Sequence, residues 1–413
     1  EYDYEVEILN DSIKRAIESE KNPYYLQQRM KVYKNEEILA FLSRKNVLPK
    51  YGFPVDTVEM TIVDKNSKNK FGLQLQRDLS MAISEYAPDS QIVANGNLIT
   101  SRYIRKIPNM SWKMYDYISC ECETLNIEPH IEDNEFSTLK ECKVCKKAID
   151  TKQRKTFLIP AFGFEADGDK IEKPGLVRPE RTYRGEVAYV GYKSEVNLQK
   201  YKIKNSDIEL YISHSDEMAV LNESNFYVCE SCGYTELRKE SFTRVKKIPH
   251  KNSAGYGCKN DGTHLLKRYS LGYRFETDVL QLRFINPDLY DKNVSLSVLY
   301  GLLRGICSFL NIEQNDISGC LQYFYNDITY RRNYAMVLYD KTPGGAGHVR
   351  RLNNQGVLED VIQETLKLME RCDCGGESKD SSCYSCLRNY YNQKHHDDIK
   401  RGYVIDFLNE VSG

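Results

Sequence analysis

The sequence predicts an α+β protein of several domains, in which mixed strands and helices are connected by short cysteine motifs. The chain has 413 residues, more than one hydrophobic core usually serves, so several domains are expected. Runs of alternating polarity, typical of strands, occur beside runs with helical spacing. A hydrophobic content of 41% with 28% charged residues argues against wholesale disorder. We place four segments at 1–110, 111–150, 151–270 and 271–413.

The first segment is predicted to be helical and then mixed. Residues 1–45 carry spaced apolar side chains interrupted by a proline, which indicates two or three short helices. Strand-like runs follow at 55–58 and 91–94, and a helix is expected at 77–86 between them. We therefore expect an α+β module in the later part of this segment.

The segment at 151–270 is predicted to be rich in strands, and the segment at 271–413 to be mixed. Alternating runs predict strands at 156–159 and 186–190. The best helix of the sequence begins near Asn293, which we expect to cap it. Its apolar face carries Leu299, Leu302, Leu303, Ile306, Cys307 and Leu310.

A strand, a glycine-containing loop and a second helix are predicted after that helix. The strand is expected at 334–339 and the loop at 340–347. The glycine run at 344–347 lacks the lysine and hydroxyl of a phosphate-binding loop, so we interpret it as a tight structural turn. One face of the following helix carries Leu358, Ile362, Leu366 and Met369.

Two sets of four cysteines have the spacing of zinc sites. Zinc takes four ligands in a tetrahedron, and two short cysteine knuckles joined by a turn supply them. Thirteen cysteines in a chain without a recognisable export signal favour metal ligands over disulfides, since the cytosol keeps thiols reduced. The two sets are Cys372, Cys374, Cys383 and Cys386, and Cys120, Cys122, Cys142 and Cys145.

A third cluster has three cysteines and needs a fourth ligand. Cys229 and Cys232 form a knuckle, and Cys258 is the remaining cysteine nearby. His250 and His264 are the candidates for the fourth ligand. We prefer His250, because the glycine-containing stretch after it can turn the chain back toward Cys258. Sites with four protein ligands leave no open position for an activated water, so we expect structural zinc rather than catalytic zinc.

Basic residues gather around tyrosines in two stretches, which is the pairing that single-strand binders use. A solvated surface is the alternative interpretation of each stretch. The formal charge of −1 supplies no global field to attract a polyanion, so any nucleic-acid contact must be local. The candidate nucleic-acid-binding residues are Arg102, Arg105, Lys106, Arg178, Arg181 and Arg184.

Catalytic motifs are weak in this sequence. It contains no G-x-x-x-x-G-K-[ST] motif, so ATP hydrolysis by that route is excluded. Asp278 and Asp340 near the glycine loop are the basis for an alternative, a metal-dependent nuclease. We identify no catalytic residue, and the acids lack a diagnostic spacing.

The C-terminal third carries four motifs in order: 274–280, the leucine-rich helix, 339–347 and the four cysteines from Cys372 to Cys386. Together they resemble the zinc-binding module of a subfamily of superfamily 2 DEAD/DEAH-box helicases, the DUF1998 or MZB type. The same module is found in a phage-defence subunit of the DISARM type. The resemblance covers residues 265–413, and more loosely the earlier chain through 48–56 and 79–88.

The resemblance implies that those four cysteines bind zinc and that the module assists a helicase motor in engaging DNA. The motor is absent here, so we expect either a part of a longer helicase or a separate subunit that works with one. The opening residue Glu1 favours a fragment. We expect a cytoplasmic protein with DNA and motor domains as partners, no membrane association, and a role in DNA repair or phage defence. A zinc-stabilised protein-assembly platform is the alternative.

Overall fold

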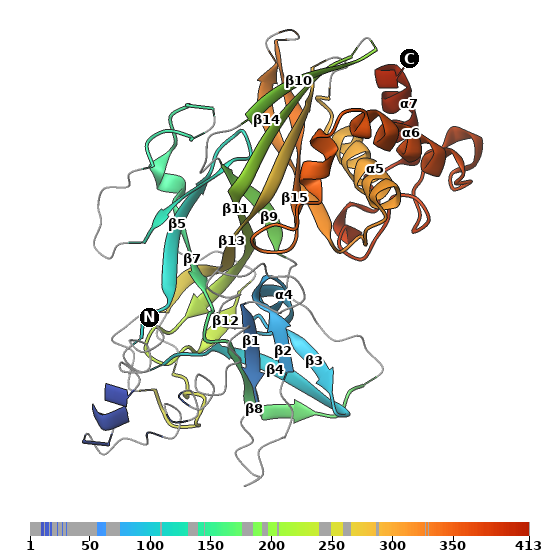
Figure 1. Cartoon of the computed structure of the whole chain (residues 1–413). Helices are drawn as coiled ribbons and strands as arrows, with labels where there is room; N and C mark the ends of the chain where they lie inside the picture. Colours follow the sequence, from blue (N-terminus) through green and yellow to red (C-terminus); the bar gives the residue numbers. More distant parts are fainter. Residues whose placement is uncertain are drawn as a thin grey trace.

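The computed structural model describes two β-sheets and a group of C-terminal helices (Figure 1). The two or three helices predicted within residues 1–45 fall almost entirely outside the described residues. These comprise isolated positions before residue 31 and then 56–62, 75–107, 110–130, 139–143, 145–175, 185–191, 197–204, 206–238, 249–258, 266–285, 289–326, 328 and 330–412.

The larger sheet has ten strands and is built around two long antiparallel strands, β11 (Ser206–Val228) and β13 (Lys267–Phe284). Their register shifts between Ser213 and Asp216 and again between Asn222 and Phe226, as at β-bulges, which bend a strand pair. Strands β9 (Glu186–Gly191), β10 (Asn197–Ile203) and β12 (Thr235–Leu237) pair with β11. Strands β7 (Lys155–Ile159) and β15 (Arg331–Asp340) pair with β13. Strand β5 (Lys113–Ser119) joins β7, β6 (Leu125–Pro129) joins β5, and β14 (Ile317–Asn326) joins β15.

This sheet combines strands from three of the four predicted segments. Strands β5 and β6 belong to the segment at 111–150, β7 and β9 to β12 to the segment at 151–270, and β14 and β15 to the segment at 271–413. The predicted strands at 156–159, 186–190 and 334–339 are all present in it. The predicted α+β class is confirmed.

The smaller sheet has five strands in the order β2-β1-β8-β4-β3. Its strands are β1 (Thr57–Thr61), β2 (Leu75–Asp78), β3 (Gln91–Ala94), β4 (Asn97–Ile104) and β8 (Phe164–Glu172). Helix α4 (Leu79–Glu85) shares one buried core with this sheet and with residues of β11 and β13. It begins two residues later than predicted, because Asp78 ends β2 and its side chain accepts a hydrogen bond from the Ser80 amide at 2.8 Å.

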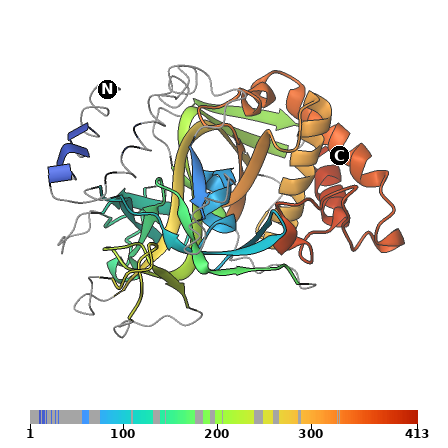
Figure 2. The same ribbon diagram turned by 90° about the horizontal axis from the view of Figure 1, so that it is seen from below.

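Three C-terminal helices cover one face of the larger sheet. They are α5 (Lys292–Leu310), α6 (Val357–Glu370) and α7 (Arg401–Ser412), and Figure 2 shows them standing together on one side of the strands. Helices α6 and α7 pack closely on α5, because a Cβ at Gly305 would lie 1.9 Å from Oγ1 of Thr365 on α6. All predicted apolar positions of these helices, Cys307 included, are buried or pack against this core.

The residue that caps the start of α5 differs from the predicted one. Asp291, not Asn293, is the N-cap, and its carboxylate accepts the amides of Asn293 and Val294 at 2.8 and 2.9 Å. The helix is long and apolar enough to cross a membrane by length and composition. Most of it is buried in the protein core, which accounts for its apolar side chains by packing.

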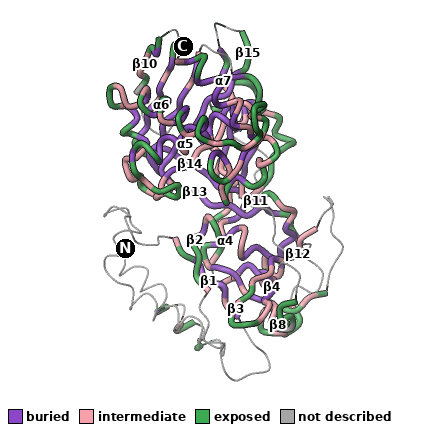
Figure 3. Tube along the Cα trace, turned by 90° about the vertical axis from the view of Figure 1, so that its right-hand side faces the viewer, coloured by how far each residue is buried: buried purple, intermediate pink, exposed green. Residues whose placement is uncertain are grey.

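The long strands connect two bodies of the protein. Figure 3 shows α5, α6, α7 and β14 in one body and β1 to β4, β8 and α4 in the other, with β11 and β13 running between them. Buried residues continue through both bodies, as one core against the helices and another beneath the smaller sheet. The metal clusters and a pocket beside the C-terminal helices lie around this framework.

Candidate metal centres and an adjoining pocket

The C-terminal cluster follows directly after α6. Cys372, Cys374, Cys383 and Cys386 place their sulfur atoms within 4.8 Å of one another. The Cys386 side chain is 2% exposed and belongs to the core beneath α5, α6 and α7. This site therefore connects the end of α6 to the start of the segment that leads into α7.

Arg401, the first residue of α7, binds backbone carbonyl groups around this cluster. Its side chain is 4% exposed and donates to the carbonyl oxygens of Cys374 at 2.6 Å, Gly376 at 3.0 Å and Met369 at 3.4 Å. Carbonyl oxygens near the metal loop are thus satisfied by a buried guanidinium. No sequence signal marked Arg401, because its partners lie up to 32 residues away.

The cluster near residue 120 is held by a β-hairpin. Cys120 and Cys122 lie between β5 and β6, and Glu123 takes a left-handed conformation (φ 57°) that reverses the chain. Cys142 and Cys145 form the second knuckle, with the Lys146 amide donating to the Cys142 carbonyl at 3.1 Å. All four sulfur atoms lie within 4.8 Å of one another, as the spacing predicted.

The third cluster contains Cys229, Cys232, His250 and Cys258. The first two cysteines follow the end of β11, and His250 stacks on Tyr234 with ring centroids 4.5 Å apart. The Cys258 amide donates to the His250 carbonyl at 3.0 Å, so the glycine-containing stretch turns the chain back as predicted. His264, the other candidate, lies outside the described residues.

This third cluster also connects the two sheets. Gly233 follows the knuckle with φ 78°, and a Cβ there would lie 1.9 Å from the Ile104 carbonyl oxygen at the end of β4. The Ile104 amide donates to the Gly233 carbonyl at 2.9 Å. Only glycine combines this backbone conformation with so close an approach. The cluster therefore joins β11 of the larger sheet to β4 of the smaller one.

The sulfur separations fit tetrahedral zinc. A zinc–sulfur distance of about 2.3 Å places neighbouring sulfur atoms roughly 3.8 Å apart. The C-terminal cluster has separations of 3.4, 3.5, 3.6 and 3.8 Å, and the Cys229–Cys258 distance is 3.9 Å. A disulfide needs about 2.05 Å, and all thirteen cysteines are free thiols. The donor sets therefore fit three zinc ions, with four protein ligands each.

Burial and neighbouring thiols keep protons on several of these cysteines in the absence of a cation. Burial raises the pKa of Cys386 to about 11, although hydrogen bonds from neighbouring groups oppose the change. In the hairpin cluster, the neighbouring Cys142 thiol and burial raise the pKa of Cys122. Zinc binding must displace these protons, so zinc affinity should fall as the solution becomes acidic.

Metal analysis should find three zinc ions per chain. Replacing His250 with alanine removes one of four ligands and is expected to lower the zinc content to two, measured by mass spectrometry on the purified protein. His214→Ala is the matched control, because His214 is exposed and belongs to none of the three clusters. A His250→Ala protein that still carries three zinc ions would show that the fourth ligand is a different group.

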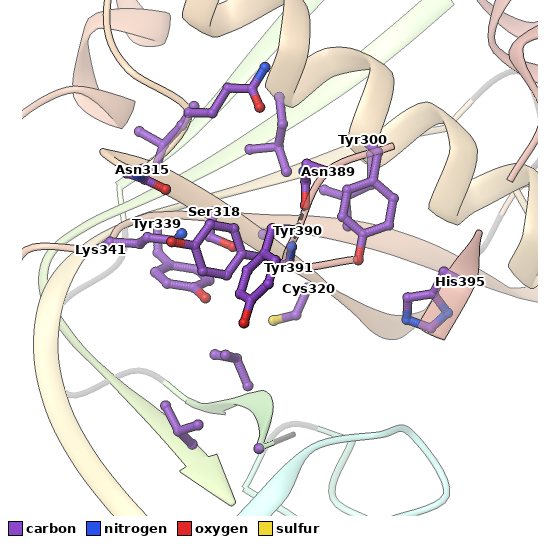
Figure 4. A pocket seen from close by; sticks show the side chains of 18 of the residues that line it. Tyr300, Asn315, Ser318, Cys320, Tyr339, Lys341, Asn389, Tyr390, Tyr391 and His395 are labelled. Carbon is purple, nitrogen blue, oxygen red and sulfur yellow. Dashed lines mark hydrogen bonds between the residues drawn. The ribbon is translucent and has the colours of Figure 1, made fainter. Parts of the chain in front are cut away.

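A pocket of about 510 Å³ adjoins the C-terminal zinc site. It lies between α4, α5, β14, β15 and the loop that follows Cys386. Figure 4 shows Lys341, Tyr339, Tyr390 and Tyr391 gathered in one part of it, with Tyr300 and His395 farther along. Sequence reasoning missed this pocket, because its walls come from segments separated by more than 200 residues.

The predicted nucleic-acid contacts of Arg102 and Arg105 are not favoured by the geometry. Arg102 pairs with Asp89 at 2.7 Å and with Asp167 at 3.8 Å, and its side chain is 12% exposed. Arg105 pairs with Glu165 at 3.6 Å. Lys106 lies with Nζ 4.4 Å from the centre of the Trp112 ring. Arg178, Arg181 and Arg184 lie outside the described residues.

The acids of the nuclease alternative bind the glycine loop instead of facing an open site. Both Asp278 on β13 and Asp340 at the end of β15 are 0% exposed. Asp340 accepts the amides of Ala346, His348 and Val349 at 2.7 to 3.0 Å. One Asp278 oxygen accepts from Gly347 at 3.0 Å and from Arg350 at 2.7 Å. These carboxylates hold the loop in its conformation by accepting its hydrogen bonds, which supports its interpretation as a structural turn.

Comparison with known proteins agrees with the resemblance noted from the sequence. Residues 298–387 match the family model MZB, the MrfA Zn-binding domain. The chain is 25% identical over 403 residues to Druantia protein DruE of Escherichia coli (strain UMEA 4076-1), a match covering 87% of this chain and 21% of that protein. The chain thus spans about a fifth of the length of this relative.

A solved structure, the crystal structure of DUF1998 helicase MrfA bound to DNA, is also similar to this chain. The similarity has a TM-score of 0.35 at 12% identity and covers 86% of this chain and 34% of that one. The matched zinc-binding domain contains all four ligands of the C-terminal cluster. The prediction of a zinc-binding, DUF1998-type module is confirmed.

Proposed function

We propose that this chain is a non-motor accessory region of a DNA helicase, which binds zinc structurally and helps the motor to engage nucleic acid. The motor can belong to the same polypeptide or to a partner. The process proposed is DNA repair or phage defence, in the cytoplasm, where reduced thiols can hold zinc.

The observation that carries this proposal is the match of residues 298–387 to the MZB domain, which takes its name from the helicase MrfA. The matched residues include most of α5, all of β14, β15 and α6, and the zinc knuckles that follow. Because every cluster offers four protein ligands, zinc would serve to hold these elements in place, with no position left for reacting water. The proposal accordingly assigns ATP hydrolysis to the motor and no reaction to this chain.

One surface favours a second candidate, a protein-assembly platform. Large side chains are exposed at the turn between β14 and β15. A further exposed one, Tyr290, lies just before the start of α5. The exposed fractions are 59% for Tyr325, 58% for Ile328, 78% for Tyr330 and 60% for Tyr290. Exposed apolar and aromatic patches commonly mark protein interfaces. A helicase motor is the partner that this surface would meet under the main proposal.

Nucleic-acid binding is tested by fluorescence anisotropy with labelled single-stranded and duplex DNA. We expect binding that weakens steeply between about 50 mM and 200 mM salt, because phosphate contacts release counterions. Removing zinc with a chelator should abolish the binding by unfolding the zinc-held segments. Zinc-loaded protein without affinity for either DNA would contradict the proposal and favour the assembly platform.

A further inference from the structure

The pocket beside the C-terminal zinc site has an aromatic wall fixed by the metal-binding segment. Tyr390 and Tyr391 are 43% and 48% exposed, and they meet edge to face with ring centroids 5.6 Å apart. Their loop is held by Asn389 and Asn392, since each side-chain oxygen accepts a backbone amide of the other at 2.8 and 3.0 Å. Two half-exposed aromatic rings are therefore presented by a loop of defined shape.

Arg388 adds a second restraint on this loop. Its guanidinium donates to Ser382 Oγ at 3.0 Å and to the His396 carbonyl at 2.9 Å, so it spans the loop from the zinc knuckle to the far end. The Leu387 carbonyl accepts from the Asn392 side chain at 2.9 Å. Preorganised aromatic side chains lose little conformational freedom when a flat ligand stacks on them.

The ammonium group of Lys341 lies against one of these two tyrosine rings. The Nζ atom of Lys341, which follows β15, is 3.7 Å from the centre of the Tyr391 ring. Among the described residues Lys341 makes no ion pair within 4.0 Å, and the same holds for Arg304 on the pocket's α5 side. Burial lowers the pKa of Lys341 to about 8. An ammonium group held this way, without a carboxylate partner, is suited to an anionic ligand.

The acids that line the pocket are engaged elsewhere. Glu123 pairs with Lys292 at 3.1 Å, and Glu85 pairs with Arg77 at 3.0 Å. Asp78 caps α4 through the Ser80 amide. The part of the pocket near Lys341 and Arg304 is therefore not neutralised by these carboxylates.

We propose that this pocket, here called the tyrosine pocket and defined by Tyr390, Tyr391, Lys341 and Arg304, binds one nucleotide of a single nucleic-acid strand. The base stacks on the exposed tyrosine rings and a phosphate faces the two cations. The volume of about 510 Å³ lies within the range of roughly 300–1,000 Å³ that is usual for sites of small organic groups. Aromatic stacking combined with nearby cations is the pattern that proteins use for single strands.

The inference rests on the proposed function, because the strand would reach the pocket as part of DNA engagement. It adds a role for the C-terminal zinc ion. The metal holds Cys386, and the loop that begins there carries the two tyrosines four and five residues later. Zinc would then position a base-binding surface as well as stabilise the fold.

The first test measures binding of fluorescein-labelled oligodeoxythymidylate to the zinc-loaded full chain. Tyr391→Ala is expected to weaken binding about tenfold, since loss of one stacked base typically costs roughly 5- to 150-fold. Phe309→Ala is the matched control, because Phe309 on α5 is 40% exposed, close to the 48% of Tyr391, and lies outside the pocket. It should bind like the unaltered protein. Equal affinities of the two variants would overturn the tyrosine pocket while leaving the proposed function standing.

A strand of the same length made only of abasic sites separates stacking from phosphate binding. Tyr391→Ala should change its affinity less than twofold. Lys341→Met should weaken both strands and reduce the slope of log affinity against log salt by about 0.7, the contribution of one phosphate contact on a single strand. An unchanged slope for Lys341→Met would remove the phosphate from the proposal.

Cross-linking locates the base and distinguishes a strand from a free nucleotide. A strand carrying 5-iododeoxyuridine is irradiated on the protein, and the attached peptide is identified by mass spectrometry. Attachment at Tyr390 or Tyr391 that excess thymidine monophosphate fails to displace supports a strand-binding site. Attachment only at other residues overturns it, and full displacement by the monophosphate would assign the pocket to a free nucleotide. Failure of the unaltered protein to bind any strand would instead reject the proposed function and this inference together.

Discussion

Cys386→Ser is expected to remove one zinc ion and to unfold the C-terminal helices at a much lower urea concentration than the unaltered protein. Structural zinc contributes on the order of 10 kcal/mol to the folding of small zinc-held segments. Here the affected segment is part of the core, because Cys386 is 2% exposed among residues of α5, α6 and α7. We expect a loss of at least about 3 kcal/mol in the free energy of unfolding. Circular dichroism during urea titration, with zinc analysis of the same sample, measures both effects.

The matched control is Cys320→Ser. Cys320 lies on β14 and is a free cysteine that belongs to none of the three clusters. This variant should keep three zinc ions and an unfolding midpoint close to that of the unaltered protein. If Cys386→Ser also kept three zinc ions and the same midpoint, the C-terminal cluster would have no structural role.

Asp340→Ala should destabilise the protein by at least about 3 kcal/mol, because it leaves three backbone amides of the glycine loop without their acceptor. Each buried donor without a partner costs roughly 1–3 kcal/mol. The carboxylate itself is fully buried, and burial raises its pKa while the three amides oppose that change. The free energy of unfolding, measured by urea titration, gives the size of the effect.

Asp406→Ala provides the comparison for this second variant. Asp406 is an exposed aspartate on α7, and its replacement is expected to change stability by less than about 0.5 kcal/mol. Similar stability of the two variants would mean that water replaces the carboxylate at the loop. In that case the loop amides would have to be solvent-accessible rather than enclosed between β13 and β15.

The candidate metal clusters were predictable because their geometry is local. Two cysteines separated by one or two residues already form half of a tetrahedral site, so spacing alone identifies the pairs. The His250 ligand followed from a turn that could be read from Asn252 to Gly257. In the structure Asn252 closes that turn, since its amide donates to the Tyr256 carbonyl at 2.8 Å.

The ion pairs of the basic residues could not be predicted, because their partners are distant in the sequence. Arg102 and Arg105 stand beside a tyrosine in the sequence, but Asp167 and Glu165 come from β8, more than 50 residues later. A basic cluster in a sequence says nothing about the acids that folding will bring to it. The tyrosine pocket was missed for the same reason, since it requires α4, α5, β14, β15 and the zinc loop to meet.

The pairing of β13, β14 and β15 in the larger sheet also determines where the chain can be truncated. Within the segment 298–387, β15 forms its hydrogen bonds with β14 on one side and with β13 on the other, and β13 lies outside that segment. A protein cut at those bounds would expose the free edge of β15 and lose Arg401 behind the zinc cluster. Exposed strand edges promote association between chains. We therefore expect a protein cut at those bounds to associate, and a version meant to fold alone should include β13 and α7.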